Sequence, residues 1–201
     1  MNIIFDFDGT ICDNFDYILQ LANIFLEKYG RKKVTKDDIK TKGLTTLIEE
    51  SGLSTLLIIY FTLIARRDIS GNILKFKLHD NLKEVITDMS KKHALGIITS
   101  NSKSNVIKFL ENNKLEQDFK FIESVLGYYS KDKRLQRVIK KFDLDLNKTY
   151  YVGDEERDIK AAKKVGVKSV AVTWGFESNR ILKREKPLYI VNTPKDLLNI
   201  F

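Results

Sequence analysis

The chain has 201 residues, of which 43% are apolar and only two are proline. These values fit one large folded domain, or one domain with a modest insertion, and exclude a disordered or linker-rich chain. The net charge of +8 comes from 35 basic and 27 acidic residues, and no basic stripe with interleaved aromatic side chains is present. We therefore expect a lysine-rich solvated surface and no nucleic-acid partner, with a positive field that attracts anionic substrates.

Cysteine content and hydropathy narrow the class of protein further. Cys12 is the single cysteine, which excludes an intramolecular disulfide and a cysteine-based zinc site. The longest apolar stretch, Leu53 to Ala65, is too short to span a bilayer. Because the first strand is predicted to begin at once, we expect no signal peptide. We expect a cytoplasmic protein without a membrane partner.

The first ten residues carry an acidic pair at the end of a strand. Ile3, Ile4 and Phe5 predict a buried strand, which leads into Asp6 and Asp8 before a Gly-Thr turn. Carboxylates two residues apart lean the same way in an extended chain, and they repel each other unless a cation lies between them. Mg²⁺ is the natural cation for such a pair. The alternative is one turn-capping carboxylate and one solvated carboxylate.

Four helical patterns follow this strand. Asp13 and Asn14 are both N-cap candidates for the first of them. The last is rich in β-branched and aromatic residues, so a strand remains an alternative there. The predicted helices are Phe15–Tyr29, Asp37–Lys42, Leu44–Glu50 and Leu53–Arg66. Four helices in a row between two strands predict a small all-helical insertion.

Strands and helices alternate after about residue 78. The predicted strands are Ala94–Thr99, Phe119–Leu126, Thr149–Val152, Ser169–Thr173 and Tyr189–Val191. The predicted helices are Leu82–Lys92, one containing Val106–Leu110, Lys131–Phe142, Ile159–Val165 and a short one from Pro194. Such alternation, with continuously apolar strands, predicts an α/β fold: a Rossmann-like three-layer α/β/α core around a parallel sheet.

Polar residues stand at two more strand-to-helix junctions. Thr99, Ser100 and Asn101 follow an apolar strand, where hydroxyl and backbone N–H groups bind phosphate oxygens well. A plain N-cap is the alternative. Lys131 begins a helix, where a cation opposes the helix dipole, and this makes a functional role more plausible. A solvated lysine is the alternative, because Lys133 and Arg134 make the segment basic.

A second acidic pair, Asp154 and Asp158, lies where the strand ending at Val152 meets the next helix. The spacing places Asp154 at the strand tip and Asp158 in the first helical turn, so both are able to face one point. Together the four junctions supply two acidic pairs, a hydroxyl group and an ammonium group. Phosphoryl transfer needs these parts: a nucleophile, an acid/base, a metal site and donors for the phosphoryl oxygens.

The four junctions resemble the four motifs of the haloacid dehalogenase superfamily. The motifs are D-x-D-G-T at 6–10, I-I-T at 97–99, Lys131, and V-G-D-x-x-x-D at 152–158, and the likeness continues through 158–166 and 172–176. The helical insertion resembles the small cap of the phosphoglycolate phosphatase-like and β-phosphoglucomutase-like branch. This resemblance implies a core of residues 1–13 and 79–201, with a helical cap at 14–78. We expect Trp174–Phe176 to serve in packing at a strand end.

The resemblance also implies roles for individual residues. Asp6 would attack phosphorus to form an aspartyl-phosphate, and Asp8 would act as general acid and then general base. Thr99 and Lys131 would bind the phosphoryl group, with Ser100 and Asn101 as further donors. Mg²⁺ would be held by Asp6, the Asp8 backbone carbonyl and Asp154. Asp158 would support the ion directly or through water, and Glu155 is the alternative candidate for a direct metal ligand. The acid at position 8 favours phosphate monoester chemistry over dehalogenation or ion pumping.

We therefore expect a Mg²⁺-dependent phosphatase of small, phosphoglycolate-like phosphorylated metabolites. The nearest alternative is a phosphohexomutase, which differs in cap residues; Lys42, Arg66 and Arg67 are candidates for contacting the substrate. A receiver-type signalling domain shares the carboxylates, Thr and Lys, but it lacks the D-x-D-G-T turn. A binding protein without catalytic activity on the same fold is the third alternative.

Overall fold

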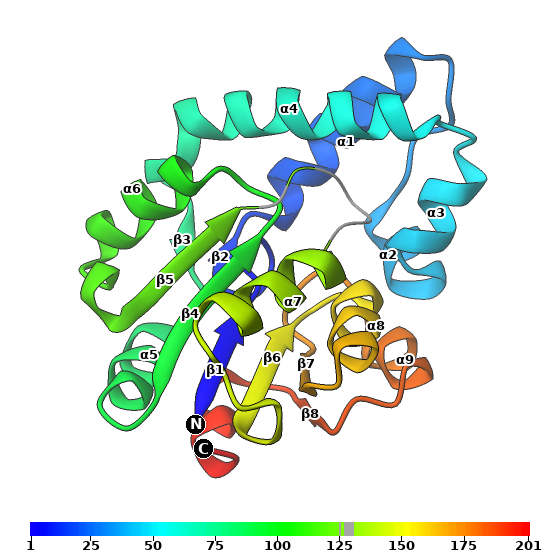
Figure 1. The fold of residues 1–201 in the computed structure, drawn as a ribbon. Helices are drawn as coiled ribbons and strands as arrows, with labels where there is room; N and C mark the ends of the chain where they lie inside the picture. Colours follow the sequence, from blue (N-terminus) through cyan, green and yellow to red (C-terminus); the bar gives the residue numbers. More distant parts are fainter. Residues whose placement is uncertain (125, 127–130) are drawn as a thin grey trace.

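A computed structural model describes residues 1–124, 126 and 131–201, and a six-stranded parallel sheet lies at its centre (Figure 1). The strand order is β5-β4-β1-β6-β7-β8, so the first strand of the chain is in the middle of the sheet. The strands are β1 (Asn2–Phe5), β4 (Ala94–Thr99), β5 (Phe119–Ser124), β6 (Thr149–Gly153), β7 (Lys168–Val172) and β8 (Tyr189–Val191). Their carboxyl ends therefore meet at one edge, as the sequence pattern predicted.

Helices cover both faces of the sheet, and β1 shows how the sequence produces this layering. Ile3 and Phe5 point to one face, where they pack against α5 (Leu82–Ser90) and α6 (Lys103–Asn113). Ile4 points to the other face, against α7 (Lys131–Lys141) and α8 (Glu156–Val165). Strands that are buried on both faces read as continuous apolar runs. The predicted Rossmann-like α/β fold is confirmed.

The helical insertion lies over the carboxyl edge of the sheet (Figure 1). It consists of α1 (Phe15–Lys28), α2 (Lys36–Lys42), α3 (Leu44–Glu50) and α4 (Thr55–Asn72), followed by the 3₁₀ turn η1 (Ile73–Lys75). The chain leaves and rejoins the core side by side, through the short antiparallel pair β2 (Cys12–Asp13) and β3 (Lys77–Leu78). These two-residue strands have no periodicity to detect, and the sequence did not predict them.

The residues Leu53–Arg66 fold as a helix, which excludes the strand alternative. The helix α4 starts at Thr55, after Ser54 caps it by accepting a hydrogen bond from the Leu57 N–H at 3.3 Å. It also continues beyond the predicted end at Arg66, to Asn72, and Ile69 in this added part is buried in the hydrophobic core. Among the described residues, no helix is long and apolar enough to cross a membrane.

The remaining differences are the ends of some elements and the short helix α9 (Asn179–Arg184), which was not predicted from the sequence. The predicted strand Phe119–Leu126 is observed to Ser124, and residue 125 lies outside the described residues. Residues 127–130, which precede Lys131, also lie outside the described residues. The chain then ends with a 3₁₀ helix, η4 (Pro194–Asn199), after the short α9 (Asn179–Arg184).

Candidate active site

The turn after β1 presents both of its carboxylates at the sheet edge. The Asp6 N–H still donates to the Val152 carbonyl at 2.9 Å, so Asp6 continues the β1–β6 ladder. Beyond it, the N–H groups of Ile11 and Cys12 both donate to the Phe7 carbonyl at 2.9 Å. Gly9 has a φ of +78°, which glycine adopts readily and other residues avoid. The D-x-D-G-T sequence is thus the sequence of a closed turn that fixes the acidic pair.

Three buried carboxylates form a cluster at this edge. One oxygen each from Asp6, Asp154 and Asp158 lie within 4.8 Å of one another. The Lys131 Nζ donates to Asp6 Oδ2 at 2.6 Å and also to Asp158 Oδ1. Burial alone would lower the pKa of Lys131, but Asp158 and Asp6 outweigh that effect and raise it. Lys131 therefore remains a cation and neutralises only part of the cluster.

The charge that remains makes this cluster suitable for a divalent cation. Burial raises the pKa of Asp158 to about 6, although Lys131 opposes the shift. Burial and the neighbouring acidic groups raise the pKa of Asp154 well above its ordinary value. Oxygen ligands from several carboxylates are what Mg²⁺ prefers, and a bound cation would relieve their repulsion. The residues present fit Mg²⁺. Asp158 belongs to the cluster and Glu155 does not.

Asp154 is held by groups from two distant segments. The Thr10 hydroxyl donates to its Oδ1 at 2.6 Å, and the Phe176 N–H donates to its Oδ2 at 2.7 Å. The Trp174 Nε1 donates to the Thr10 carbonyl at 3.0 Å. The segment Trp174–Phe176 therefore supports an acidic residue of the site in addition to packing at the strand end.

We expect Gly175→Ala to displace Asp154. An added Cβ would lie 2.3 Å from Asp154 Oδ2 and 2.4 Å from its Cβ, closer than atoms can approach. We expect a loss of about 1–3 kcal/mol in the free energy of unfolding and a weaker stabilisation by Mg²⁺, both measured by thermal melting with and without the ion.

Gly71→Ala is the matched control, because nothing lies within 4 Å of its added Cβ in α4. That variant should be as stable as the wild type or slightly more stable. Equal Mg²⁺ responses in the two variants would contradict the contact with Asp154.

Asp8 is separate from the acidic cluster and is held by two amides. The Nδ2 atoms of Asn14 and Asn101 donate to its Oδ1 at 2.7 and 2.9 Å. Burial, reinforced by the nearby Asp6 carboxylate, raises the pKa of Asp8 to about 6. A carboxyl group with that pKa can hold a proton near neutrality and also release it, which is what a general acid and base require.

The predicted phosphate-binding residues after β4 lie at the same edge. Thr99 is buried, and its Oγ1 accepts from the Asn101 N–H at 2.9 Å. Ser100 borders the cavity beside the site. The Asn101 side chain is occupied by Asp8, Ser102 and Asn105, so its amide orients the acid in this structure. A phosphate-binding role for these residues stays a prediction.

The three basic cap candidates lie in different places. The Arg66 Nε donates to the Ser100 carbonyl at 2.7 Å, which brings this side chain to the site. Lys42 pairs with Glu50 at the surface at 2.7 Å. Arg67 is exposed. Arg66 is thus the one of the three that the structure brings to the carboxyl edge of the sheet, next to Ser100.

The segment after β7 also binds the helical insertion. The Lys40 Nζ donates to the Gly175 carbonyl at 2.6 Å, and the Ser178 hydroxyl donates to the Lys40 carbonyl at 2.6 Å. The buried Glu177 carboxylate accepts from the Leu44 N–H at the start of α3 at 2.7 Å, and from the Glu156 N–H at the start of α8 at 2.6 Å. One side chain therefore joins the insertion to the core.

We expect Glu177 to make stability depend on pH. Burial, then Glu155, raises its pKa from 4.5 to about 8, so between these values the folded chain holds a proton that the unfolded chain releases. Its stabilising contribution is complete below pH 4.5 and is lost as the pH rises through 8. The stability of the wild type relative to Glu177→Gln should fall over this window, by at most about 1.4 kcal/mol per pH unit. Urea unfolding of both proteins at pH 5, 6.5 and 8 measures this difference, and parallel curves would contradict it.

Sequence reasoning missed several residues that orient the acidic groups. Asn14 was considered only as an N-cap; it occupies that position, but its side chain bonds to Asp8 and not to the helix. Thr10 was part of the D-x-D-G-T motif, but no role was predicted for its side chain. The contact from Phe176 to Asp154 is made by the backbone N–H, so the residue type does not reveal it. A buried amide four residues after a D-x-D-G-T turn is the one signal that could have found Asn14.

Comparison with known proteins agrees with this geometry. A family model described as haloacid dehalogenase-like hydrolase matches residues 3–172. A phosphoglycolate phosphatase from Synechococcus elongatus is 30% identical over 200 residues, covering 98% of this chain and 94% of that protein. The chain therefore belongs to the haloacid dehalogenase-like hydrolase family, and the resemblance seen in its four motifs is confirmed.

Solved structures show the same fold. A protein from Clostridium acetobutylicum described as a predicted phosphatase superposes with a TM-score of 0.82 at 22% identity, covering 99% of this chain and 96% of that one. A haloacid dehalogenase-like hydrolase from Streptococcus pneumoniae gives 0.79 at 22% identity, covering 100% and 97%. At this identity the likeness concerns the fold.

Proposed function

We propose that this phosphatase hydrolyses small phosphorylated metabolites in a Mg²⁺-dependent reaction that passes through an aspartyl-phosphate. The observation that carries the proposal is the buried trio of Asp6, Asp154 and Asp158, with Lys131 between two of its members and Asp8 beside it. The match with a phosphoglycolate phosphatase over nearly the whole chain supports a phosphate monoester as substrate.

The first step is carried by Asp6 and Asp8. An Asp6 carboxylate oxygen forms a bond to phosphorus while the bond between phosphorus and the ester oxygen breaks. Asp8 donates its proton to the departing oxygen, which leaves as an alcohol. The raised pKa of Asp8, about 6, keeps part of it protonated near neutral pH. Asn14 and Asn101 hold this carboxyl group in place.

The second step returns the enzyme to its starting state. Asp8, now a carboxylate, takes a proton from a water molecule whose oxygen attacks phosphorus. The bond between Asp6 and phosphorus breaks, and inorganic phosphate is released. We assign binding of the phosphoryl oxygens to Lys131, Thr99 and Ser100. Asn101 acts mainly by orienting Asp8.

Asp6, Asp154 and Asp158, together with the Asp8 backbone carbonyl, would hold Mg²⁺. When bound, the ion supplies positive charge that offsets the carboxylates and the phosphoryl oxygens. We further propose that residues 14–78 form a cap over a core of residues 1–13 and 79–201, because the paired β2 and β3 mark both crossings. Movement of such a cap would admit substrate and exclude water.

The test is hydrolysis of p-nitrophenyl phosphate with Mg²⁺ and with a chelator. We expect turnover with the ion and loss of activity without it. Mg²⁺ should also raise the melting temperature of the wild type and not that of Asp154→Asn; saturation at about 100 times Kd contributes about 2.7 kcal/mol. Turnover that survives chelation would exclude the metal. Transfer of phosphate to a second sugar hydroxyl without phosphate release would favour the mutase.

A further inference from the structure

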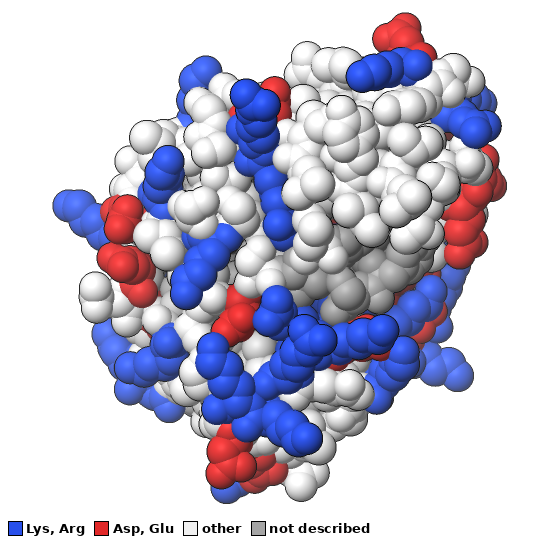
Figure 2. Space-filling view, turned by 45° about the horizontal axis from the view of Figure 1, so that its top comes forward, with Lys and Arg blue, Asp and Glu red and all other residues white. Residues whose placement is uncertain are grey.

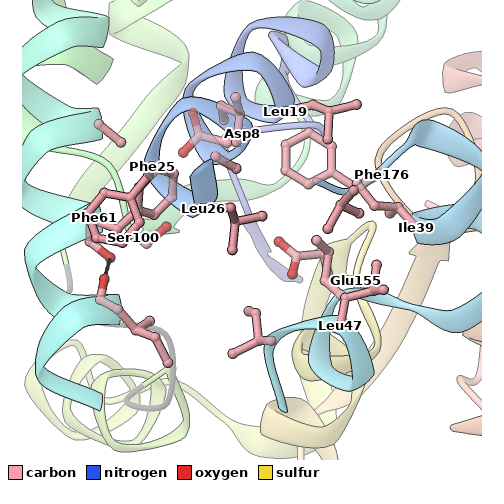
Figure 3. Close-up of a pocket in the computed structure, with 18 of the residues that line it drawn as sticks. Asp8, Leu19, Phe25, Leu26, Ile39, Leu47, Phe61, Ser100, Glu155 and Phe176 are labelled. Atoms are coloured by element: carbon pink, nitrogen blue, oxygen red, sulfur yellow. Dashed lines mark hydrogen bonds between the residues drawn. The ribbon is translucent and has the colours of Figure 1, made fainter. Parts of the chain in front are cut away.

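A cavity of about 210 Å³ extends from the catalytic edge into the helical insertion. Figure 3 shows Leu19, Phe25, Leu26 and Phe61 around it, with Asp8 at its border. These apolar residues come from α1 and α4, and further apolar residues come from α3. The cavity is therefore formed by the helical insertion at one end and by the catalytic acid at the other.

The polar groups on its wall are concentrated at the catalytic end. Among the described residues that line the cavity, the charged side chains are Asp8, Arg66, Glu155 and Arg157. Glu155 and Arg157 pair with each other at 2.7 Å, beside the acidic cluster. Arg66 donates to the Ser100 carbonyl and to the Ser124 hydroxyl, at 2.7 and 3.1 Å. All four charges therefore lie at the end of the cavity that faces the acidic cluster.

The inner part of the cavity offers little to a polar ligand. Among the described residues, two hydroxyl groups line this part, and both donate within their own segments: Thr62 to the Ile58 carbonyl at 2.9 Å, and Ser51 to the Ile48 carbonyl at 2.6 Å. On the outer surface, Figure 2 shows a broad uncharged area in its upper right part, whereas many Lys and Arg side chains gather in its lower half. A charged or hydroxylated group placed in this part would lose its water and gain few hydrogen-bond partners from the described residues.

We propose that this cavity binds the alcohol part of the substrate, and that this part is apolar: an alkyl or aryl phosphate monoester. The inference rests on the proposed phosphatase function and specifies its substrate class. Asp8 supplies the geometric argument, because it borders the cavity and would protonate the leaving oxygen. The carbon chain attached to that oxygen then extends between Leu26, Phe61 and Leu47. An apolar cavity of about 150 Å³ is enough for a benzene ring, so this one accommodates a ring or a chain of several carbons.

The experiment compares methyl, propyl and hexyl phosphate with phosphoglycolate in the presence of Mg²⁺. Burial of one methylene group is worth roughly fourfold in binding, so we expect kcat/KM to rise about 10²-fold or more from methyl to hexyl phosphate. Phosphoglycolate should be poorer than propyl phosphate. Equal values along the alkyl series, or a preference for phosphoglycolate, would overturn the inference and leave the phosphatase function intact.

Two variants locate the effect in the cavity. Leu19→Asn places an amide on the cavity wall and should lower the hexyl-to-methyl ratio of kcat/KM by about tenfold. Ile24→Asn makes the same kind of change in the same helix, at a side chain that is 58% exposed and does not line the cavity, and should leave the ratio unchanged. Ala22→Leu fills part of the cavity and should reduce the ratio without adding a polar group. An unchanged ratio in both cavity variants, each with a normal melting temperature, contradicts the proposal.

Binding of phosphonates, which are not hydrolysed, separates the two ideas. We expect calorimetry to show hexylphosphonate bound at least tenfold more tightly than methylphosphonate. If no phosphate ester is hydrolysed but this difference remains, the catalytic proposal fails and the cavity assignment stands. Equal binding of the two phosphonates would exclude the apolar site whatever the turnover.

Discussion

Replacement of Asp6 by Asn should reduce phosphatase turnover by about 10⁴-fold or more, the scale seen when an enzyme loses its nucleophile. Asn has the shape of Asp but no anionic oxygen to attack phosphorus. Its carbonyl oxygen can still accept from the Phe7 N–H, which bonds to Asp6 Oδ1 at 2.8 Å. Phosphate release from p-nitrophenyl phosphate in Mg²⁺ measures the loss.

The control is Asp16→Asn in α1. Asp16 pairs with Lys36 at the surface, and its side chain is 76% exposed. This variant should retain full activity. That result would show that the loss of one aspartate charge does not by itself cause the fall in turnover. Acid quenching of the wild type during turnover should also trap phosphate on the protein, and the Asp6→Asn variant should trap none. Turnover that persists in Asp6→Asn would refute the nucleophile assignment.

Replacement of Asp8 by Asn should cost about 10²–10⁴-fold in steady-state turnover, the usual worth of general acid–base catalysis. The two steps should respond differently. Nitrophenolate leaves without a proton, so the first turnover of p-nitrophenyl phosphate should remain fast and appear as a burst. Later turnovers should be slow, because no base activates the water. With an alkyl phosphate, the first turnover should be slow as well.

Rapid mixing with the two substrates distinguishes this role from a loss of structure. Asn14 and Asn101 still find an acceptor in the amide oxygen of the variant, so the site should stay folded and the melting temperature should change little. Equal slowing of the first turnover for both substrates, with no burst, would contradict the assignment of Asp8 as the acid.

The acidic site was predictable because its parts follow strands of one parallel sheet. Asp6, Thr99 and Asp154 each stand at or just after the end of a buried strand, and parallel strands bring their carboxyl ends to one edge. Their continuous apolar runs, bounded by turn residues, were enough to find these strands. The four helices between β1 and β4 were also predictable, because each shows a helical pattern of apolar residues.

The supporting contacts were not predictable, because they join residues with no local relation. The Thr10 hydroxyl binds Asp154 from 144 positions earlier in the sequence. The Phe176 N–H binds the other oxygen of the same side chain from 22 positions later. Asn14 is at an N-cap position by local rules, yet tertiary structure uses its side chain for Asp8. The cavity was equally hidden, since the same apolar residues in α1 and α4 satisfy an ordinary helix pattern.

The central position of β1 has a consequence for how the protein is made. Asn2 pairs with Ala94 on one side and, on the other, with Thr149, which follows it by 147 residues. At about 5–20 residues per second, a ribosome needs roughly ten seconds or more to produce that second partner. The residues of helices α1 to α4, 15–72, are all synthesised before either of these partners. Asp6 is thus among the first residues synthesised, but the acidic cluster with Asp154 and Asp158 can form only after synthesis has passed Asp158. The contact from Phe176 to Asp154 requires a still longer chain.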